Sequence, residues 1–317
     1  MRNGKWAAVF ENGYESGSTS RLFIVDLAAP STPIVIDTAG GTGLSAVALL
    51  PNSAGQVEYA YGGDLAGNVW KFDLSSTDSA EWELAYKLFT AQDANGNTQP
   101  ISGAPTLGLN PSKNNAVMVY LGTGKYFDAG DNNTPATPRH SFYALADTGS
   151  TIEYTQATRN TVLHRKAFSN ESTATKRVIT GERNANGTSD VDWASKRGWF
   201  IDFSTANGER VVTKPLLVYD RLIFTTLIPS TLQCDYGGSG WLMELVGVGN
   251  RNIAHSILGD LANSALDNAV LGDLSITTGP GPDRVNIIPC DIKGDCDLIE
   301  GVAPAGARGR MSWRQVR

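Results

Sequence analysis

A strand–turn–strand pattern at residues 59–74 limits the folds open to this chain more than any other stretch. Tyr59 and Tyr61 suit a pleated, half-buried strand, and residues 62–68 supply the glycines and polar residues of a turn. The chain then returns as a second apolar strand that ends at Leu74. The pattern predicts a β-hairpin.

The return strand of this hairpin alternates between apolar and charged residues. Trp70, Phe72 and Leu74 alternate with Lys71 and Asp73. Because successive side chains of a strand point to opposite faces of the sheet, this order predicts one buried face and one face in water.

Similar hairpins recur along the chain, each with an apolar strand, a glycine-containing turn and a second apolar strand. The related stretches are residues 6–14 with 21–27, residues 117–127 with 140–147, and residues 198–203 with 221–228 and 240–246. Such repetition is typical of a β-propeller, in which each sheet buries both faces against its neighbours. A β-sandwich is the alternative, but it imposes no internal likeness. We therefore expect an all-β fold with four propeller-like units and long irregular loops.

The stretches between the units are less regular. Residues 81–89 fit an outer strand, and residues 252–274 have loose helical spacing that predicts a short helix. Residues 277–317 begin with a Gly/Pro-rich run and are expected to form a closing segment. We expect one domain over residues 1–317.

Composition and charge limit the kinds of partner that this chain is expected to bind. Hydrophobic residues make up 41% of the 317 residues and charged residues 18%, and the 34 glycines with 14 prolines predict many tight turns. The net charge is −6 and no run of Lys or Arg occurs, so the sequence predicts no nucleic-acid partner. No apolar run approaches the roughly 20 residues of a membrane-spanning helix.

The start of the chain and its cysteines bear on the compartment. The first residues lead directly into a strand pattern without a signal peptide, which is typical of a cytoplasmic protein or of a fragment. A start inside a structural repeat favours the fragment. Cys290 and Cys296 are close enough to close a small loop in an oxidising compartment, which would leave Cys234 unpaired.

Several short sequence motifs of this chain resemble those of the C-terminal propeller domain of the PilC/PilY family of type IV pilus-tip adhesins and pilus-biogenesis factors. They occur in the family's order and are spread over almost the whole chain. The matching motifs are residues 61–74, 122–126, 208–212, 224–229 and 309–315.

The resemblance implies a partial β-propeller, formed by the C-terminal blades of a longer exported protein. It implies a non-enzymatic, secreted module of pilus assembly and cell adhesion, located at the pilus tip (fimbrium) or the outer membrane. The implied partners are minor pilins and host or abiotic surfaces. A quinone-dependent propeller enzyme and an intracellular propeller scaffold remain open as alternatives.

The family often carries a calcium loop just before the hairpin at residues 59–74. Laid onto this chain, the ligand positions become Leu50, Asn52, Ala54, Gln56 and Glu58. The ligand set that remains is the side chains of Asn52 and Glu58 with the backbone carbonyl of Gln56. Since calcium prefers several carboxylates, we expect a degenerate loop that binds calcium weakly or not at all.

Other oxygen-rich stretches are interpreted as ordinary loops. Residues 93–99 lack the later carboxylate of a calcium loop and predict a turn. The cluster of Asp128, Asp131, Asn132 and Asn133 is expected to be solvated. The sequence predicts no zinc site either, because His140, His164 and His255 are not close to the cysteines in sequence.

No residue pattern predicts an enzyme. The Gly-x-Ser-x-Gly elbow is missing, and residues 122–126 lack the spacing of a phosphate-binding loop and predict a turn. The seven tryptophans are interpreted as blade core. We expect neither a catalytic site nor a tightly bound cofactor.

A short loop near the C-terminus carries the adhesion hypothesis. Lys293, Gly294 and Asp295 lie between Cys290 and Cys296. A Lys-Gly-Asp tripeptide in a disulfide-closed loop is pre-organised for receptor binding, because the constraint lowers the entropy lost on binding. The simpler interpretation is a stapled surface loop.

Overall fold

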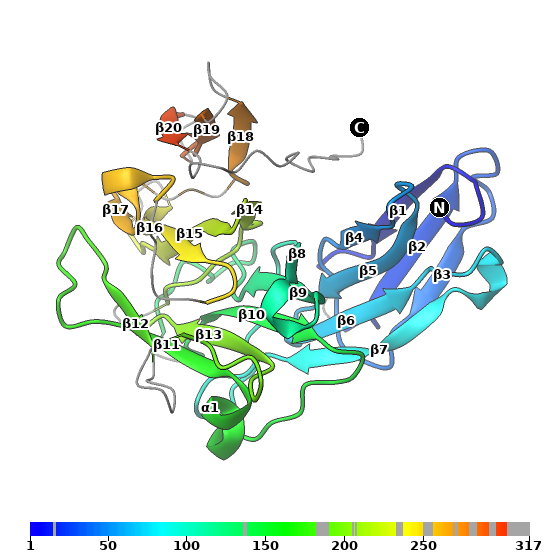
Figure 1. The fold of residues 1–317 in the computed structure, drawn as a ribbon, viewed down its shortest axis with the longest axis horizontal. Helices are drawn as coiled ribbons and strands as arrows, with labels where there is room; N and C mark the ends of the chain where they lie inside the picture. The colour runs from blue at the N-terminus through cyan, green and yellow to red at the C-terminus, as the bar shows by residue number, and fades with distance from the viewer. Residues whose placement is uncertain are drawn as a thin grey trace.

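The chain folds as a succession of β-sheets in an open arc (Figure 1). The computed structural model describes residues 1–14, 17–135, 138–181, 190–204, 206, 208–232, 237–249, 256–268, 270, 272–278, 284–291 and 296–302. Within these residues the strands form five sheets, which follow one another in chain order from the blue β1–β3 to the orange and red β18–β20. The predicted all-β fold is confirmed.

Five sheets replace the four units expected from the sequence. The first contains β1 (Ala7–Glu11), β2 (Arg21–Asp26) and β3 (Ile34–Asp37), and the second contains β4 (Ala48–Pro51), β5 (Val57–Gly63), β6 (Asn68–Asp73) and β7 (Glu83–Thr90). The third contains β8 (Thr106–Asn110), β9 (Ala116–Gly122), β10 (Ser141–Asp147), β11 (His164–Phe168), β12 (Ile179–Gly181) and β13 (Gly198–Asp202). The fourth contains β14 (Leu216–Val218), β15 (Arg221–Pro229), β16 (Gly238–Val246) and β17 (Ser264–Leu266), and the fifth contains β18 (Ser275–Thr278), β19 (Arg284–Ile288) and β20 (Ile299–Val302).

Helices are short and serve as connections. The α-helix α1 (Arg159–Val162) follows the 3-10 turn η3 (Gln156–Thr158). The other 3-10 turns in the described residues are η1 (Ser79–Glu81), η2 (Pro111–Lys113) and η4 (Gly259–Leu261). In the described part of residues 252–274, the expected short helix is reduced to the 3-10 turn η4, and the residues that follow form the edge strand β17.

The hairpin at residues 59–74 is confirmed as the antiparallel pair β5–β6. Its turn is closed by Asp64, whose carboxylate accepts hydrogen bonds from the Asn68 backbone (2.9 Å) and the Trp70 indole (2.7 Å). Gly67 has φ +80, a left-handed conformation that favours glycine, and a β-carbon there would lie 2.8 Å from the carbonyl of Ala91. Local turn chemistry therefore sets the register of this hairpin.

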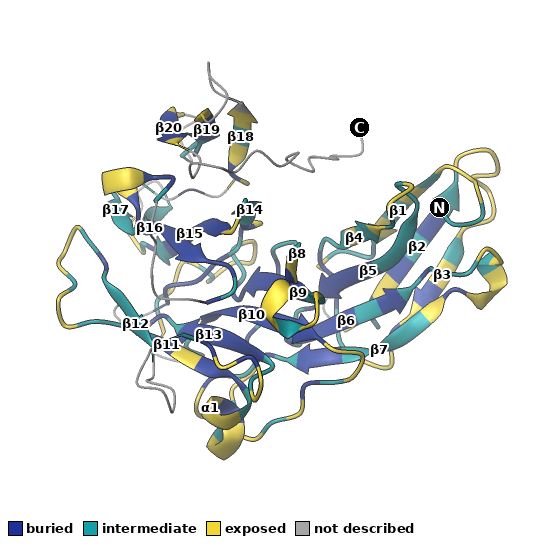
Figure 2. Cartoon of the chain, in the orientation of Figure 1, coloured by how far each residue is buried: buried dark blue, intermediate teal, exposed yellow. Residues whose placement is uncertain are grey.

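Successive sheets pack face to face through four apolar clusters. In the second sheet, Trp70 and Phe72 pack against the first sheet, whereas Tyr61 and Val69 pack against the third. The same alternation continues through the third and fourth sheets, so each of these sheets has two buried faces. Figure 2 accordingly shows β10 and β15 buried, with exposure concentrated in loops and α1. The first strands of the second, third and fourth sheets lie in sequence, since β4 contacts β8 and β8 contacts β14.

This packing corrects two expectations and adds detail to a third stretch. Lys71 lies on a face that packs against the third sheet instead of facing water, and its side chain is only 14% exposed. Residues 198–203 provide β13, which pairs with β10 and so belongs to the third sheet instead of the fourth unit. The expected closing segment contributes strands to a fifth sheet, whose residues Val285 and Ile287 pack against the fourth.

The outer face of the first sheet is apolar and exposed among the residues that the structure describes. Phe10 and Phe23 are opposite one another in the β1–β2 ladder, and their rings stack with centroids 5.5 Å apart. Val35 is opposite Phe23 on β3, and it is exposed. Trp6 (76% exposed) and Leu27 extend the same face by strand alternation. A contiguous apolar face of this kind marks a contact surface.

Candidate functional site

The predicted calcium loop is the connection between β4 and β5. The side-chain oxygen of Asn52 accepts hydrogen bonds from the backbone N–H groups of Ala54 and Gln56, both at 3.0 Å. The Asn52 amide nitrogen donates to the side-chain oxygens of Gln56 (3.2 Å) and Glu58 (3.3 Å). The backbone carbonyl of Gln56 accepts from the Asn52 N–H at 2.8 Å. Asn52 therefore closes the loop upon itself.

Leu50 and Ala54 do not complete a metal site. Leu50 packs against the apolar cluster between the second and third sheets, and Ala54 is exposed. Among the residues that the structure describes, no group of three or more His, Cys, Asp and Glu is arranged to hold a metal ion. The three predicted residues Asn52, Gln56 and Glu58 do come together, but Gln56 and Glu58 do so as hydrogen-bond acceptors of the Asn52 amide.

Two of the family motifs meet at one loop although they are far apart in the sequence. The N–H of Val211 donates to the carbonyl of Thr123 at 3.0 Å, which brings residues 208–212 beside residues 122–126. The approach is so close that a β-carbon at Gly122 would lie 2.2 Å from the Val211 β-carbon. Glycine at this position is therefore required by packing between the third and fourth sheets.

Arg210 holds the loop that follows β9. Its guanidinium donates to the carbonyls of Lys125 (2.9 Å), Asp131 (3.0 Å) and Asn133 (3.1 Å), and to that of Gly208 (2.8 Å). Arg210 itself is buried. A planar cation with several donors thus fixes the path of residues 125–133, which we name the Arg210 loop.

The Arg210 loop presents an aromatic and charged surface. Phe127 is 41% exposed and stacks on Tyr14 from the first sheet, with ring centroids 4.4 Å apart. Lys125 forms ion pairs with Asp128 and with Asp131, the latter at 3.2 Å. Asp131 also accepts the backbone N–H groups of Phe127 (3.0 Å) and Asp128 (2.8 Å). The expectation of a solvated acidic cluster is correct for Asp128 but wrong for Asp131, whose side chain is 13% exposed.

A buried histidine lies at the base of this loop. The Nδ1 atom of His140 lies 3.5 Å from the Thr123 hydroxyl. Burial, assisted by the positive charge of Arg210, lowers the pKa of His140 to about 3. The ring is therefore neutral throughout the physiological pH range.

Residues 93–99 form the predicted turn. The carboxylate of Asp93 accepts from the backbone N–H groups of Asn95 and Asn97, both at 2.9 Å, and from that of Arg139 at 3.2 Å. Burial raises the pKa of Asp93, but the hydrogen bonds from the Asn97 side chain and from these backbone groups outweigh it and lower that pKa. The Asp93 oxygens therefore accept hydrogen bonds from the backbone of two loops.

A lysine enclosed by tyrosines joins the second and third sheets. Asp147 at the end of β10 accepts hydrogen bonds from Tyr61 (2.7 Å) and Tyr86 (2.5 Å), and pairs with Lys71 at 2.9 Å. The Lys71 ammonium lies 4.4 Å from the ring centroid of Tyr59. Burial raises the pKa of Asp147, but the hydrogen bonds from Tyr86 and Lys71 outweigh it and lower that pKa.

Two buried arginines form further ion pairs. Arg177 and Glu209 make a bidentate pair at 2.6 and 2.7 Å, with side chains 2% and 0% exposed. Arg159 pairs with Asp202 at 2.9 Å and donates to the Tyr143 hydroxyl at 2.6 Å. Sequence reasoning missed both pairs, because charged residues in polar stretches carry no signal that they are buried.

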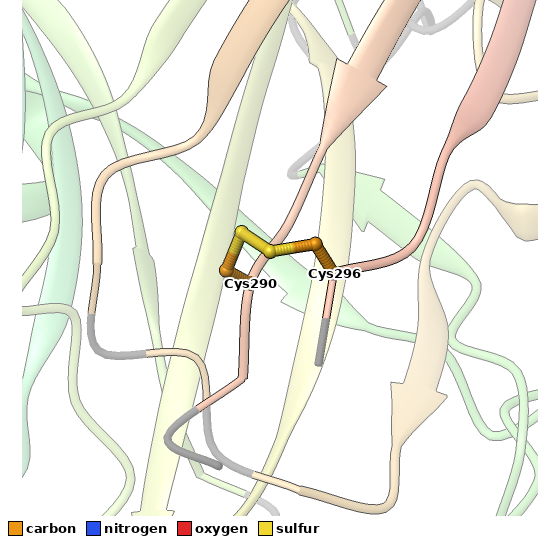
Figure 3. The surroundings of a disulfide bond; sticks show 2 residues. All are labelled: Cys290 and Cys296. Carbon is orange, nitrogen blue, oxygen red and sulfur yellow. A yellow bond between two sulfur atoms is a disulfide. The ribbon is translucent and has the colours of Figure 1, made fainter. Parts of the chain in front are cut away.

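The expected pairing of Cys290 with Cys296 is present, as Figure 3 shows. The two cysteines flank the hairpin connection between β19 and β20 and also form an isolated antiparallel bridge. The predicted adhesion residues Lys293, Gly294 and Asp295 lie outside the described residues, as do Cys234, His255 and residues 309–315.

The fold defines the class of protein. Sheets that stack face to face in an arc, with their first strands adjacent, form a partial β-propeller. The family model described as the PilY1 beta-propeller domain matches residues 1–176, which is more than half of the chain. The chain belongs to this family.

Individual relatives agree with this assignment. The chain is 29% identical to a type IV pilus biogenesis factor PilY1 homolog of Xylella fastidiosa and 26% identical to the type IV pilus biogenesis factor PilY1 of Pseudomonas aeruginosa PAO1. Both matches cover 100% of this chain, but only 25% and 31% of those relatives. The crystal structure of the P. aeruginosa PilY1 C-terminal domain superposes with a TM-score of 0.71 at 23% identity, over 95% of this chain and 70% of that one. This likeness confirms the fold.

The helices that the structure describes include none with the length and apolar character needed to cross a membrane.

Proposed function

We propose that this chain is a non-enzymatic module of a type IV pilus system that acts in pilus assembly and adhesion. The observation that carries the proposal is membership of the PilY1 propeller family, together with relatives named as type IV pilus biogenesis factors. We infer that the module belongs to a longer exported protein at the pilus tip or outer membrane. Its proposed partners are minor pilins and host or abiotic surfaces.

The use of the buried ionisable groups supports a non-enzymatic role. Asp147 binds Tyr61 of the second sheet, Arg177 binds Glu209 in the segment after β13, and Arg159 binds Tyr143 within the third sheet. A catalytic acid or base needs a free position within hydrogen-bond reach of a substrate. Groups that are committed to such structural contacts stabilise the scaffold instead.

The Arg210 loop supplies the proposed contact surface. Arg210 fixes the backbone of this loop through three of its carbonyls, so Phe127 is displayed from a rigid base. Exposed aromatic residues on a pre-organised loop lose little entropy on binding and often dominate the affinity of protein contacts. We propose that Phe127 and Asp128 contact a pilus component.

The test replaces Phe127 by alanine in the full-length protein in its host. The matched control is Leu232→Ala, since Leu232 is also an exposed apolar residue but lies after β15. Loss of a dominant aromatic contact costs about 2 kcal/mol or more, roughly a thirtyfold weaker affinity. We expect Phe127→Ala to reduce surface pili and attachment at normal protein level, while the control leaves both unchanged.

Three results would overturn the proposal. One is normal piliation and attachment in a strain that lacks the whole chain. Another is retention of the protein in the cytoplasm, which would favour the intracellular scaffold. The third is copurification of a quinone with dehydrogenase turnover, which would favour the propeller enzyme.

A further inference from the structure

Arg2 lies against the loop in which the family resemblance implies calcium. Its Nη1 atom donates to the side-chain oxygen of Gln56 at 2.9 Å, and its Nε atom lies 3.7 Å from the same Glu58 oxygen that accepts from Asn52. The Nε atom also donates to the carbonyl of Ser75 at 3.0 Å, just after β6. The guanidinium therefore bridges the segment before β1 to two parts of the second sheet.

The oxygens of this loop are already occupied by N–H donors. Asn52 Oδ1 accepts two backbone N–H groups, and the Gln56 side-chain oxygen accepts from the Asn52 amide and from Arg2. Glu58 Oε1 accepts from the Asn52 amide and lies within ion-pair distance of Arg2. Exchanging the oxygen and nitrogen of the Asn52 amide would point its NH₂ group at two N–H donors, so hydrogen bonding sets its orientation. A nitrogen donor thus faces the one carboxylate of the loop.

These residues do not fit a calcium ion. Calcium takes six to eight oxygen ligands at about 2.3–2.6 Å, typically with several carboxylates. Here Glu58 is the sole carboxylate among the five ligand positions, and Leu50 is part of the packing between the second and third sheets. A permanent positive charge already lies beside Glu58.

We propose that Arg2 is the built-in cation of this loop and makes the joint between the first and second sheets independent of calcium. The guanidinium neutralises Glu58 and satisfies Gln56, which are roles that a bound divalent cation would otherwise fill. Because Arg2 is covalently part of the chain, the joint persists at any calcium concentration.

The first arm of the experiment compares thermal unfolding of the parent chain in about 1 mM calcium chloride, a level at which extracellular calcium modules bind, and in excess chelator. We expect the same unfolding midpoint in both, and no heat in a calorimetric titration with calcium chloride. A midpoint that rises with calcium would overturn the proposal.

The second arm removes the cation. Arg2→Met should lower the midpoint by about 2–4 °C, and Arg2→Lys should restore part of this loss because it keeps the charge without the planar fork. The matched control is Arg21→Met, which breaks an exposed pair with Asp37 and should change the midpoint little.

The third arm asks whether Arg2 acts through its proposed partner. In a Glu58→Gln background, Arg2→Met should have a much smaller effect than in the parent chain, since the carboxylate that needs neutralising is gone. Equal losses in both backgrounds, or a loss no larger than that of Arg21→Met, would show that Arg2 is not the cation of this loop. None of these measurements depends on a role in pili, so they fail or succeed separately from the proposed function.

Discussion

Breaking the Arg177–Glu209 pair should destabilise the protein far more than removing both charges. The pair joins the third and fourth sheets, because Arg177 precedes β12 and its guanidinium also packs on the ring of Trp241 in β16 at 4.1 Å. On its other side the guanidinium lies 4.3 Å from the Phe168 ring centroid. We expect Arg177→Met and Glu209→Met each to leave an unbalanced charge in this aromatic environment.

The magnitude follows from burial. The Arg177 and Glu209 side chains are 2% and 0% exposed, so water cannot solvate the charge that remains when its partner is removed. Each single substitution should therefore lower the free energy of unfolding by about 3–5 kcal/mol. The double variant Arg177→Met/Glu209→Met buries two apolar side chains of similar volume, so it should cost about 2 kcal/mol or less, and part of that cost is the lost cation–π contact. The two single losses should therefore be strongly non-additive.

The assay is equilibrium unfolding in urea, followed by tryptophan fluorescence, for the parent, the two single variants and the double variant. The control cycle uses Arg284 and Glu300, a pair at 3.0 Å whose side chains are 52% and 53% exposed. Each control substitution should cost less than about 1 kcal/mol, and the losses should add.

Two results would refute this reasoning. Single losses near those of the exposed pair would mean that water reaches the Arg177–Glu209 pair. A double variant that loses the sum of both singles would mean that the two charges act independently.

Two further predictions concern pH and self-association. Since burial lowers the pKa of His140 from 6.5 to about 3, the unfolded chain takes up a proton that the folded chain refuses, and stability should fall as pH drops through this range. In pH-dependent urea unfolding, His140→Asn should flatten that fall by about 1.4 kcal/mol per pH unit, and an unchanged slope would contradict the burial argument. The exposed apolar face of the first sheet should cause the isolated chain to self-associate, and Trp6→Ser with Phe10→Ser should shift it toward monomer in light scattering. Leu232→Ser is the control, and a parent chain that is monomeric at high concentration would count against this role of the face.

Much of the strand pattern could be predicted from the sequence because it depends on local chemistry. The hairpin β5–β6 and the outer strand β7 follow from alternation and turn residues within short windows. Residues 252–274 were harder, since apolar spacing over a few residues suits a helix or a strand. Tertiary pairing of residues 264–266 with β16 decides for the strand.

Sheet membership could not be predicted in the same way. β13 follows β12 in the chain but lies between β10 and β11, and its pairing with β11 is parallel. A parallel neighbour requires a long crossover, so no turn signal links the two strands. The same limitation applies to Lys71. Its position in the alternating strand predicted that it faces water, but in the folded protein the third sheet covers it.

The sequence by itself determined the fold class and the family. These follow from features that depend on residues near one another: β-strands, glycine turns, the PilY1-type motifs and a close cysteine pair. Only the tertiary structure decided which charges meet. Arg210 binds carbonyls as far as 85 residues away, Lys71 pairs with Asp147, and Arg2 reaches Gln56 over 54 residues. A charged side chain bonds to whatever group the folded backbone brings within about 3–4 Å, and sequence spacing does not encode that proximity.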